Sequence, residues 1–273
     1  MTPSVPQSFD DIESWARHYI LSSELETKLQ PPPVPEHFAD QPTPERLERP
    51  GRPRELRPAK RGERTPKLEA LADPHYRART LHSFFHHELQ AAELMCCAIL
   101  AFADAEVEFR RDLLRICRDE IRHMNLYREQ IERLGCRIGD FGVRDWFWKR
   151  VPSCVDKVSF VALMGMGLEG ANLEHAPAFA ARFRVVGDEE GALVQERVAK
   201  EELAHVRIAT RWFQRWTGGC DFDEWLERLP PPLSPLLLRG TPLARELRLR
   251  AGMSEDFIAA LAAYVPEAKG RSA

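Results

Sequence analysis

The sequence predicts an all-α fold, a four-helix bundle with one long connection between its second and third helices. Apolar residues recur at helical spacing through four long stretches, and no stretch shows the strict alternation that marks a strand. The breaks within the first pair and within the second pair are short, whereas residues 135–155 separate the two pairs. The four predicted helices cover about 74–103, 105–134, 156–185 and 188–217.

An N-terminal segment precedes the bundle. Residues 9–29 carry a helical stripe that opens at Asp10 or Asp11, so we expect one helix there. Residues 30–70 are rich in proline and arginine, which predicts extended backbone. We therefore assign residues 1–70 to a helix and an extended segment that pack on the bundle.

The bundle itself is assigned to residues 71–218. Asp104 is a candidate N-cap for its second helix, and Gly135 is a C-cap signal at the end of that helix. The second hairpin is expected to turn near Val186-Gly187-Asp188. Gly165 and Gly167 in the third helix predict that another helix or a ligand approaches closely there.

A C-terminal helical tail is assigned to residues 219–273. A short helix is expected over Asp221–Leu229, followed by a break at Pro230-Pro231-Pro232 and a last helix near Ser254–Tyr264.

Composition narrows the classes of partner. The formal net charge is −3, from 39 basic and 42 acidic residues, so the chain has no overall attraction to nucleic acid or anionic membrane. No apolar run reaches 18 residues, and the N-terminus lacks a basic and apolar leader, so we expect neither a spanning helix nor a signal peptide. None of the six cysteines forms a C-x-x-C pair, which indicates reduced thiols and a cytoplasmic location.

Two short motifs carry the chemistry, Glu120-Ile-Arg-His123 and Glu202-Leu-Ala-His205. Residues three apart on a helix share a face, so each carboxylate and imidazole can bind the same metal ion. One Glu-x-x-His arises readily by chance, so the evidence for a metal site lies in the spacing of the two copies.

Each motif follows an upstream glutamate at nearly the same distance. Glu88 lies 32 residues before Glu120, and Glu169 lies 33 before Glu202. A glutamate on each of two helices, with a Glu-x-x-His on each of the other two, is the ligand set of a four-helix di-iron or di-manganese carboxylate site. The alternative is that these glutamates and histidines are surface charges on ordinary bundle helices.

A second glutamate follows each upstream one by five residues, giving Glu93 after Glu88 and Glu174 after Glu169. Positions five apart point in different directions around a helix, so only one of each pair faces the centre. Equal height above the first turn favours Glu88 over Glu93, which lies about 7 Å lower. In the second hairpin both remain possible, and we choose Glu169 by analogy with the first half.

The predicted ligands are Glu88, Glu120, His123, Glu169, Glu202 and His205, with Glu93 and Glu174 as alternates or supporting residues. Four carboxylates and two imidazoles suit two iron ions, with Fe/Mn or Mn/Mn pairs as alternatives, better than tetrahedral zinc. Gln90 and Asn172 are candidates to orient these ligands.

The string His86-His-Glu-Leu-Gln-Ala-Ala-Glu93, with Asp119-Glu-Ile-Arg-His123, Gly139-Asp-Phe141, Glu169-Gly-Ala-Asn-Leu-Glu174 and Glu201-Glu-Leu-Ala-His205-Val, resembles a bacterial ferritin-like family, domain of unknown function 455. The resemblance covers nearly the whole chain and implies a ferritin-like bundle with a non-haem di-iron centre. The layout is also similar to the tRNA-modifying di-iron hydroxylases, although the Cys that precedes their glutamate is absent before Glu88.

The leading interpretation is an oxidoreductase that uses a di-iron cluster and dioxygen or peroxide on an unknown small organic substrate, with an external electron donor. The alternatives are a ferroxidase that handles iron, and a non-enzymatic ferritin-like binding module. We expect a monomer or homodimer with no membrane partner. Nucleic acid is not expected, although the hydroxylase likeness keeps tRNA open.

Overall fold

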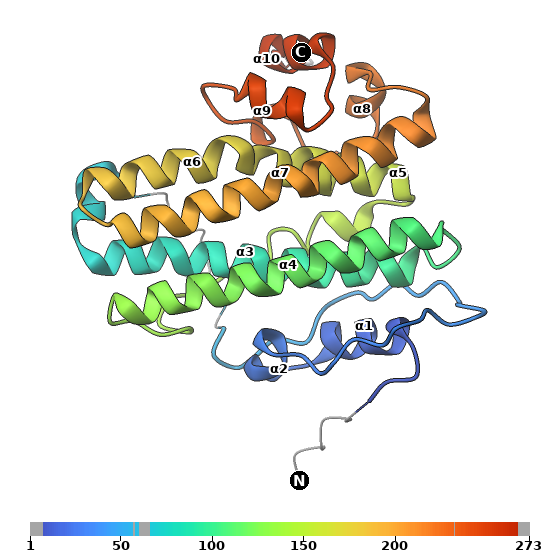
Figure 1. The fold of residues 1–273 in the computed structure, drawn as a ribbon, viewed down its shortest axis with the longest axis horizontal. Coiled ribbons are helices and arrows are strands. Elements are labelled where there is room, and N and C mark those ends of the chain that lie inside the picture. The colour runs from blue at the N-terminus through green and yellow to red at the C-terminus, as the bar shows by residue number, and fades with distance from the viewer. Residues whose placement is uncertain (1–7, 57, 60–65, 232, 267–273) are drawn as a thin grey trace, which may run out of the picture. The chain divides into compact units, whose positions relative to one another are not determined.

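A computed structural model describes residues 8–56, 58–59, 66–231 and 233–266, and over these ranges the chain is all-α (Figure 1). These ranges hold no β-strand, only an isolated bridge between Pro58 and Val143. Described residues of Met1–Ser153 and Ala181–Val194 form one compact unit, and those of Cys154–Ala180 and Gln195–Ala273 form a second. The prediction of three parts, 1–70, 71–218 and 219–273, stays a prediction.

The first unit is built on an antiparallel pair of long helices, α3 (Pro74–Ala101) and α4 (Val107–Arg133), which lie side by side in Figure 1. Asp73 caps α3 by accepting a hydrogen bond from the backbone of His75, and Pro74 occupies the first helical position, where no N–H is needed. Gly135 follows α4 with a φ of 82°, a conformation that only glycine adopts without strain.

The turn between α3 and α4 differs from the prediction in one respect. The residue at the N-cap of α4 is Glu106, not Asp104, and its side chain makes no capping hydrogen bond. The backbone N–H of Ala105 instead donates to the carbonyl of Phe102, and both residues are buried. Because the turn is packed in this way, α4 begins at Val107, after Asp104, the residue that capping rules favour.

The N-terminal helix is divided in two, α1 (Ile12–Leu21) and α2 (Leu25–Leu29), whereas the sequence predicted one helix over 9–29. Lys28 folds back so that its Nζ donates to the carbonyl oxygens of Tyr19 (2.5 Å) and Ile20 (2.9 Å). These contacts, with the backbone N–H of Gly51 on the Ile20 carbonyl, satisfy groups that a continuous helix would have bonded internally. The rest of the predicted extended segment has no helix up to a 3₁₀ turn, Leu68–Ala72, and residues 57 and 60–65 lie outside the described ranges.

The segment after α4 is fixed to α3 by two polar side chains. The backbone N–H of Gly139 donates to Nε2 of His82 at 2.9 Å. Gln90 accepts from the backbone of Phe147 and Trp148 and donates to the carbonyl of Arg144. Gln90 therefore holds this connection, and does not orient a ligand as the sequence suggested. A 3₁₀ turn, Val151–Ser153, ends the segment.

The second unit contains a helical segment that sequence periodicity does not distinguish from an α-helix. The predicted helix over 156–185 is three pieces: α5 (Lys157–Phe160), a π-helical segment η3 (Val161–Glu169) and α6 (Gly170–Val185). Gly165 is needed here because a Cβ would lie 2.2 Å from the Cβ of Ala209 on the following long helix. The predicted close approach at Gly165 is confirmed.

The remaining helices are α7 (Glu189–Thr217), α8 (Phe222–Glu227), the 3₁₀ turn Pro235–Leu237, α9 (Arg245–Arg250) and α10 (Glu255–Ala263). The turn into α7 contains Gly187, with a φ of 78°, as the sequence predicted. Trp225 of α8 donates from Nε1 to the carbonyl of Ala162, which ties the tail to the π-helical segment. α9 was not predicted from the sequence. The predicted break at Pro230-Pro231-Pro232 includes Pro232, which lies outside the described residues.

Two further observations concern the chain as a whole. Within the ranges that the structure describes, no helix combines the length and apolarity needed to cross a bilayer. All six cysteines are free, and four of them are buried.

Candidate metal centre

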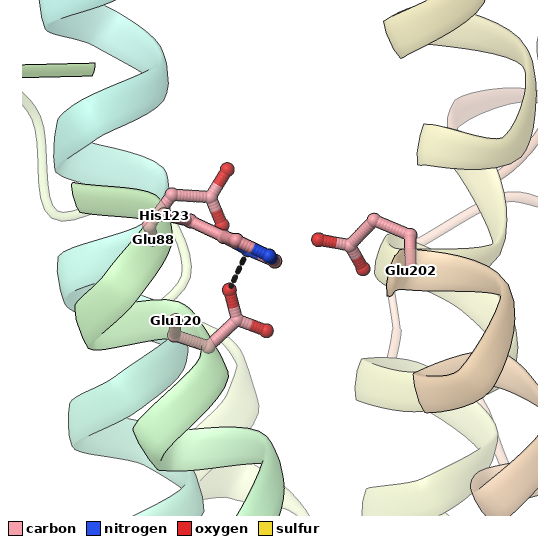
Figure 2. Close-up of side chains that lie close together, drawn as sticks. All are labelled: Glu88, Glu120, His123 and Glu202. Atoms are coloured by element: carbon pink, nitrogen blue, oxygen red, sulfur yellow. Dashed lines mark hydrogen bonds and ion pairs between the residues drawn. The ribbon is translucent and has the colours of Figure 1, made fainter. Parts of the chain in front are cut away.

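The first unit brings together two carboxylates and an imidazole. Glu88 on α3 and Glu120 and His123 on α4 each offer one ligand atom, and these atoms lie within 4.8 Å of one another (Figure 2). Glu88 is 5% exposed and the other two are fully buried. His123 Nδ1 lies 3.0 Å from Glu120 Oε2, as expected for residues one turn apart on the same face. A buried group of this composition can hold a divalent metal ion.

The second unit contains a matching pair on α7. His205 Nδ1 lies 3.3 Å from Glu202 Oε2, and the two side chains are 1% and 0% exposed. Figure 2 also draws Glu202. Glu169, the last residue of the π-helical segment, is buried and accepts a hydrogen bond from Nδ2 of Asn172 at 3.5 Å. The interpretation of Asn172 as a partner of Glu169 therefore agrees with this contact.

Glu93, the alternate on α3, is fully occupied by other donors. Its Oε1 lies 2.8 Å from Nζ of Lys28 and 2.5 Å from Nη1 of Arg52, and its Oε2 accepts from Nε1 of Trp148 at 2.8 Å. Glu93 and Lys28 are fully buried. This carboxylate is neutralised by two cations and has no need of a metal ion.

Arg52 extends the same network to the segment after α4. Its Nε lies 2.8 Å from Oδ1 of Asp145, which is also 3.1 Å from Nε2 of His86. Burial opposes the charge of Asp145, but the hydrogen bond to His86 and the nearby Arg52 outweigh it and lower the pKa of Asp145 to about 2. Burial also lowers the pKa of His86, which favours the neutral ring.

Glu174, the alternate on α6, is saturated in the same way by the tail. Arg248 contacts it in a bidentate arrangement, Nε to Oε1 and Nη2 to Oε2, both at 2.8 Å. The backbone N–H groups of Gly240 and Ala244 each add a hydrogen bond at 2.9 Å. Each oxygen of Glu174 thus accepts two hydrogen bonds from protein donors, so this carboxylate is already satisfied without a metal ion.

The predicted site residues thus separate into two groups. Glu88, Glu120 and His123 come together within the first unit, and His205 lies against Glu202 within the second. Their roles as metal ligands stay predictions. Sequence reasoning missed the cations that occupy the alternates, namely Lys28, Arg52 and Arg248, because isolated basic residues in short helices and loops give no sign of burial.

The donor chemistry fits a divalent first-row metal. Carboxylate oxygens and imidazole nitrogens suit iron and manganese, and a buried position excludes competing water. Bare carboxylates are costly to bury together without a compensating positive charge. The cluster on α3 and α4 contains two carboxylates and one histidine, and bound metal would supply that charge.

Comparisons with known proteins give one curated relative and one matching family model. The chain is 27% identical over 200 residues to an uncharacterised protein of Haemophilus influenzae, covering 70% of this chain and 69% of the relative. No solved structure is significantly similar. A family model described as "Protein of unknown function (DUF455)" matches residues 9–259, nearly the whole length, and the chain therefore belongs to that family.

Proposed function

We propose that this protein is a ferritin-like, non-haem di-iron oxidoreductase that acts on a small organic substrate with dioxygen or peroxide. The ligands are Glu88, Glu120, His123, Glu169, Glu202 and His205. The observation that carries the proposal is the sorting of the glutamates. On α3, Glu93 is saturated by Lys28, Arg52 and the indole N–H of Trp148, which leaves Glu88, the residue that equal height above the turn selects. On α6, Glu174 is saturated by Arg248 and two backbone N–H groups, which leaves Glu169, the residue chosen by analogy with the first half.

The proposal assigns the long helices of the chain, α3, α4, the π-helical segment with α6, and α7, to a ferritin-like four-helix bundle. It is supported by the duplicated pattern of an upstream glutamate and a downstream Glu-x-x-His, each set buried within its own unit. Two divalent metal ions held by these residues would offset the charge of the four carboxylates and would supply the redox chemistry that dioxygen requires.

The residues of the chain have separate tasks in this proposal. Glu120 and His123 share one helical face, so they hold one ion with a fixed relative geometry, and Glu202 with His205 do the same for the other. The burial of the ligands keeps bulk water away from the metals. Asn172 donates to Glu169 and so orients one of its oxygens.

The long extensions favour an enzyme over an iron-storage protein. The N-terminal segment and the tail are each held by buried ion pairs, Lys28 with Glu93 and Arg248 with Glu174. A storage cage needs only the compact bundle, whereas an enzyme must also cover its site and select a substrate.

Anaerobic reconstitution tests the proposal. The apoprotein is loaded with ferrous iron, and Mössbauer spectra are recorded before and after exposure to air. We expect a coupled pair of high-spin ferrous ions that becomes a coupled diferric pair with consumption of dioxygen. Iron oxidation that continues well beyond two ions per chain, with a 24-subunit shell by size-exclusion chromatography, would indicate iron handling. Bound iron with no oxygen consumption under any reductant would indicate a binding module.

A further inference from the structure

Arg248 contacts α6, the helix that begins directly after Glu169, at more than one point. Besides the bidentate pair with Glu174, its Nη2 donates to the carbonyl oxygens of Gly170 (3.0 Å) and Leu238 (3.3 Å). The side chain is fully buried. Gly170 directly follows Glu169, so the guanidinium fixes the backbone next to the proposed ligand.

The same part of the tail packs along the π-helical segment. A Cβ on Gly167 would lie 3.0 Å from Cδ1 of Leu238, and a Cβ on Gly240 would lie 2.3 Å from the Cβ of Glu174. Leu238 is fully buried. The tail therefore packs tightly on this part of the chain: a side chain at Gly240 would clash with Glu174, and one at Gly167 would require Leu238 to shift by a few tenths of an ångström.

The position of Glu169 depends on whether the segment Val161–Glu169 stays π-helical. The backbone N–H of Gly170 reaches back five residues to the carbonyl of Gly165, a spacing that proteins use rarely and often near functional sites. If the segment returned to α-helical hydrogen bonding, its residues would shift by one position relative to α6, which is about 100° around the helix. Glu169 would then point elsewhere.

We propose that residues 238–248 brace the π-helical segment Val161–Glu169, and that Arg248 is a positioning residue that sets the direction of the Glu169 side chain. This inference rests on the proposed function, in which Glu169 binds metal. The tail would then contribute to metal binding, although it lies far in sequence from every proposed ligand.

The N-terminal segment offers a matched comparison. Lys28 is also a fully buried cation on a glutamate five residues after a proposed ligand, here Glu93 after Glu88. However, α3 is an uninterrupted α-helix over Pro74–Ala101, so its own hydrogen bonds fix the direction of Glu88. Loss of Lys28 removes a buried ion pair without freeing a ligand to turn.

The test compares Arg248→Met, Arg248→Lys and Lys28→Met with the wild-type chain. Amide hydrogen exchange of 161–170 is followed in the metal-free proteins. Affinity for Co²⁺, whose visible absorption reports its ligand geometry, is measured by anaerobic titration. Arg248→Met should speed exchange in this segment and weaken Co²⁺ binding by about 10- to 100-fold, the usual effect of losing a residue that orients a ligand. Arg248→Lys should lie between, because lysine keeps the charge but not the planar fork.

Lys28→Met should lower stability while leaving both the exchange of 161–170 and the affinity for Co²⁺ at wild-type values. If the Arg248 variants match wild type in exchange and affinity while the wild type binds Co²⁺, the brace is wrong and the metal site stands. If Lys28→Met weakens Co²⁺ binding as much as Arg248→Met, the effect is general destabilisation and the brace is also wrong. A wild type that binds no Co²⁺ would overturn the metal site, and with it the role given to Arg248.

Discussion

Nζ of Lys28 lies 2.8 Å from Oε1 of Glu93, and both side chains are fully buried. Such a pair is seldom a large net source of stability, because both charges give up their hydration. It is, however, expensive to break. The pair therefore fixes where the N-terminal segment lies on α3 and removes Glu93 from competition for metal.

Glu93→Ala should lower the free energy of unfolding by about 3–5 kcal/mol, because Lys28 and Arg52 lose their buried counter-charge. The variant should nevertheless retain its metal, in contrast to Glu88→Ala. Urea unfolding and elemental analysis measure the two properties separately. Metal loss in Glu93→Ala with retention in Glu88→Ala would reverse the assignment on α3.

Glu169→Gln and Glu174→Gln should differ in a complementary way. Glu174→Gln puts an amide where two oxygens accept four hydrogen bonds, so the unfolding free energy should fall by several kcal/mol, on the scale of a broken buried pair. Glu169→Gln should instead weaken metal binding and leave the metal-free protein at least as stable as wild type. Thermal melts of the apo forms and metal titrations distinguish the two positions, and equal loss of metal in both variants would count against the choice of Glu169 over Glu174.

His82 should make the stability depend on pH. Burial, aided by the nearby His86, lowers the pKa of His82 from 6.5 to about 4. Between these pH values the unfolded chain binds a proton that the folded chain does not, so stability falls as pH drops from 6.5 towards 4. The contribution lost is on the order of 3 kcal/mol. His82→Gln should flatten this part of the curve, measured by urea unfolding at a series of pH values. Parallel curves for variant and wild type would contradict the assignment.

Chelation should lower the melting temperature while leaving the helical signal at room temperature. Metal that binds only the folded state stabilises it by about 2.7 kcal/mol at a hundredfold excess over Kd. For a chain of this size that corresponds to several degrees. Circular dichroism follows both quantities, and Glu88→Ala provides the control because it should melt alike with and without chelator. An unchanged wild-type melt after proven metal removal would argue against a buried site.

The sequence predicted the helical class and most helix ends well, because those depend on local signals. Gly135 and Gly187 lie in the turns where the sequence predicted them. It also predicted the grouping of Glu88, Glu120 and His123, because helical spacing and equal height above a turn are enough to bring them together.

What the sequence could not predict depends on contacts between distant segments. Lys28 divides the N-terminal helix and forms an ion pair with Glu93, 65 residues further along the chain. Arg248 forms an ion pair with Glu174, which lies 74 residues before it in the sequence. The π-helical segment next to Glu169 has the apolar composition of a buried helix, and nothing in its periodicity marks the change in hydrogen bonding. The Gly139-Asp-Phe141 string is explained only by the structure, in which the Gly139 N–H meets His82.

The proposed two-metal site is tested most directly by counting the metal ions per folded chain in the wild type, His123→Ala and His205→Ala, purified anaerobically with iron supplied. We expect two ions in the wild type and a marked loss in each variant, because each histidine belongs to a different half of the proposed two-metal site. Two ions retained in both variants would contradict it.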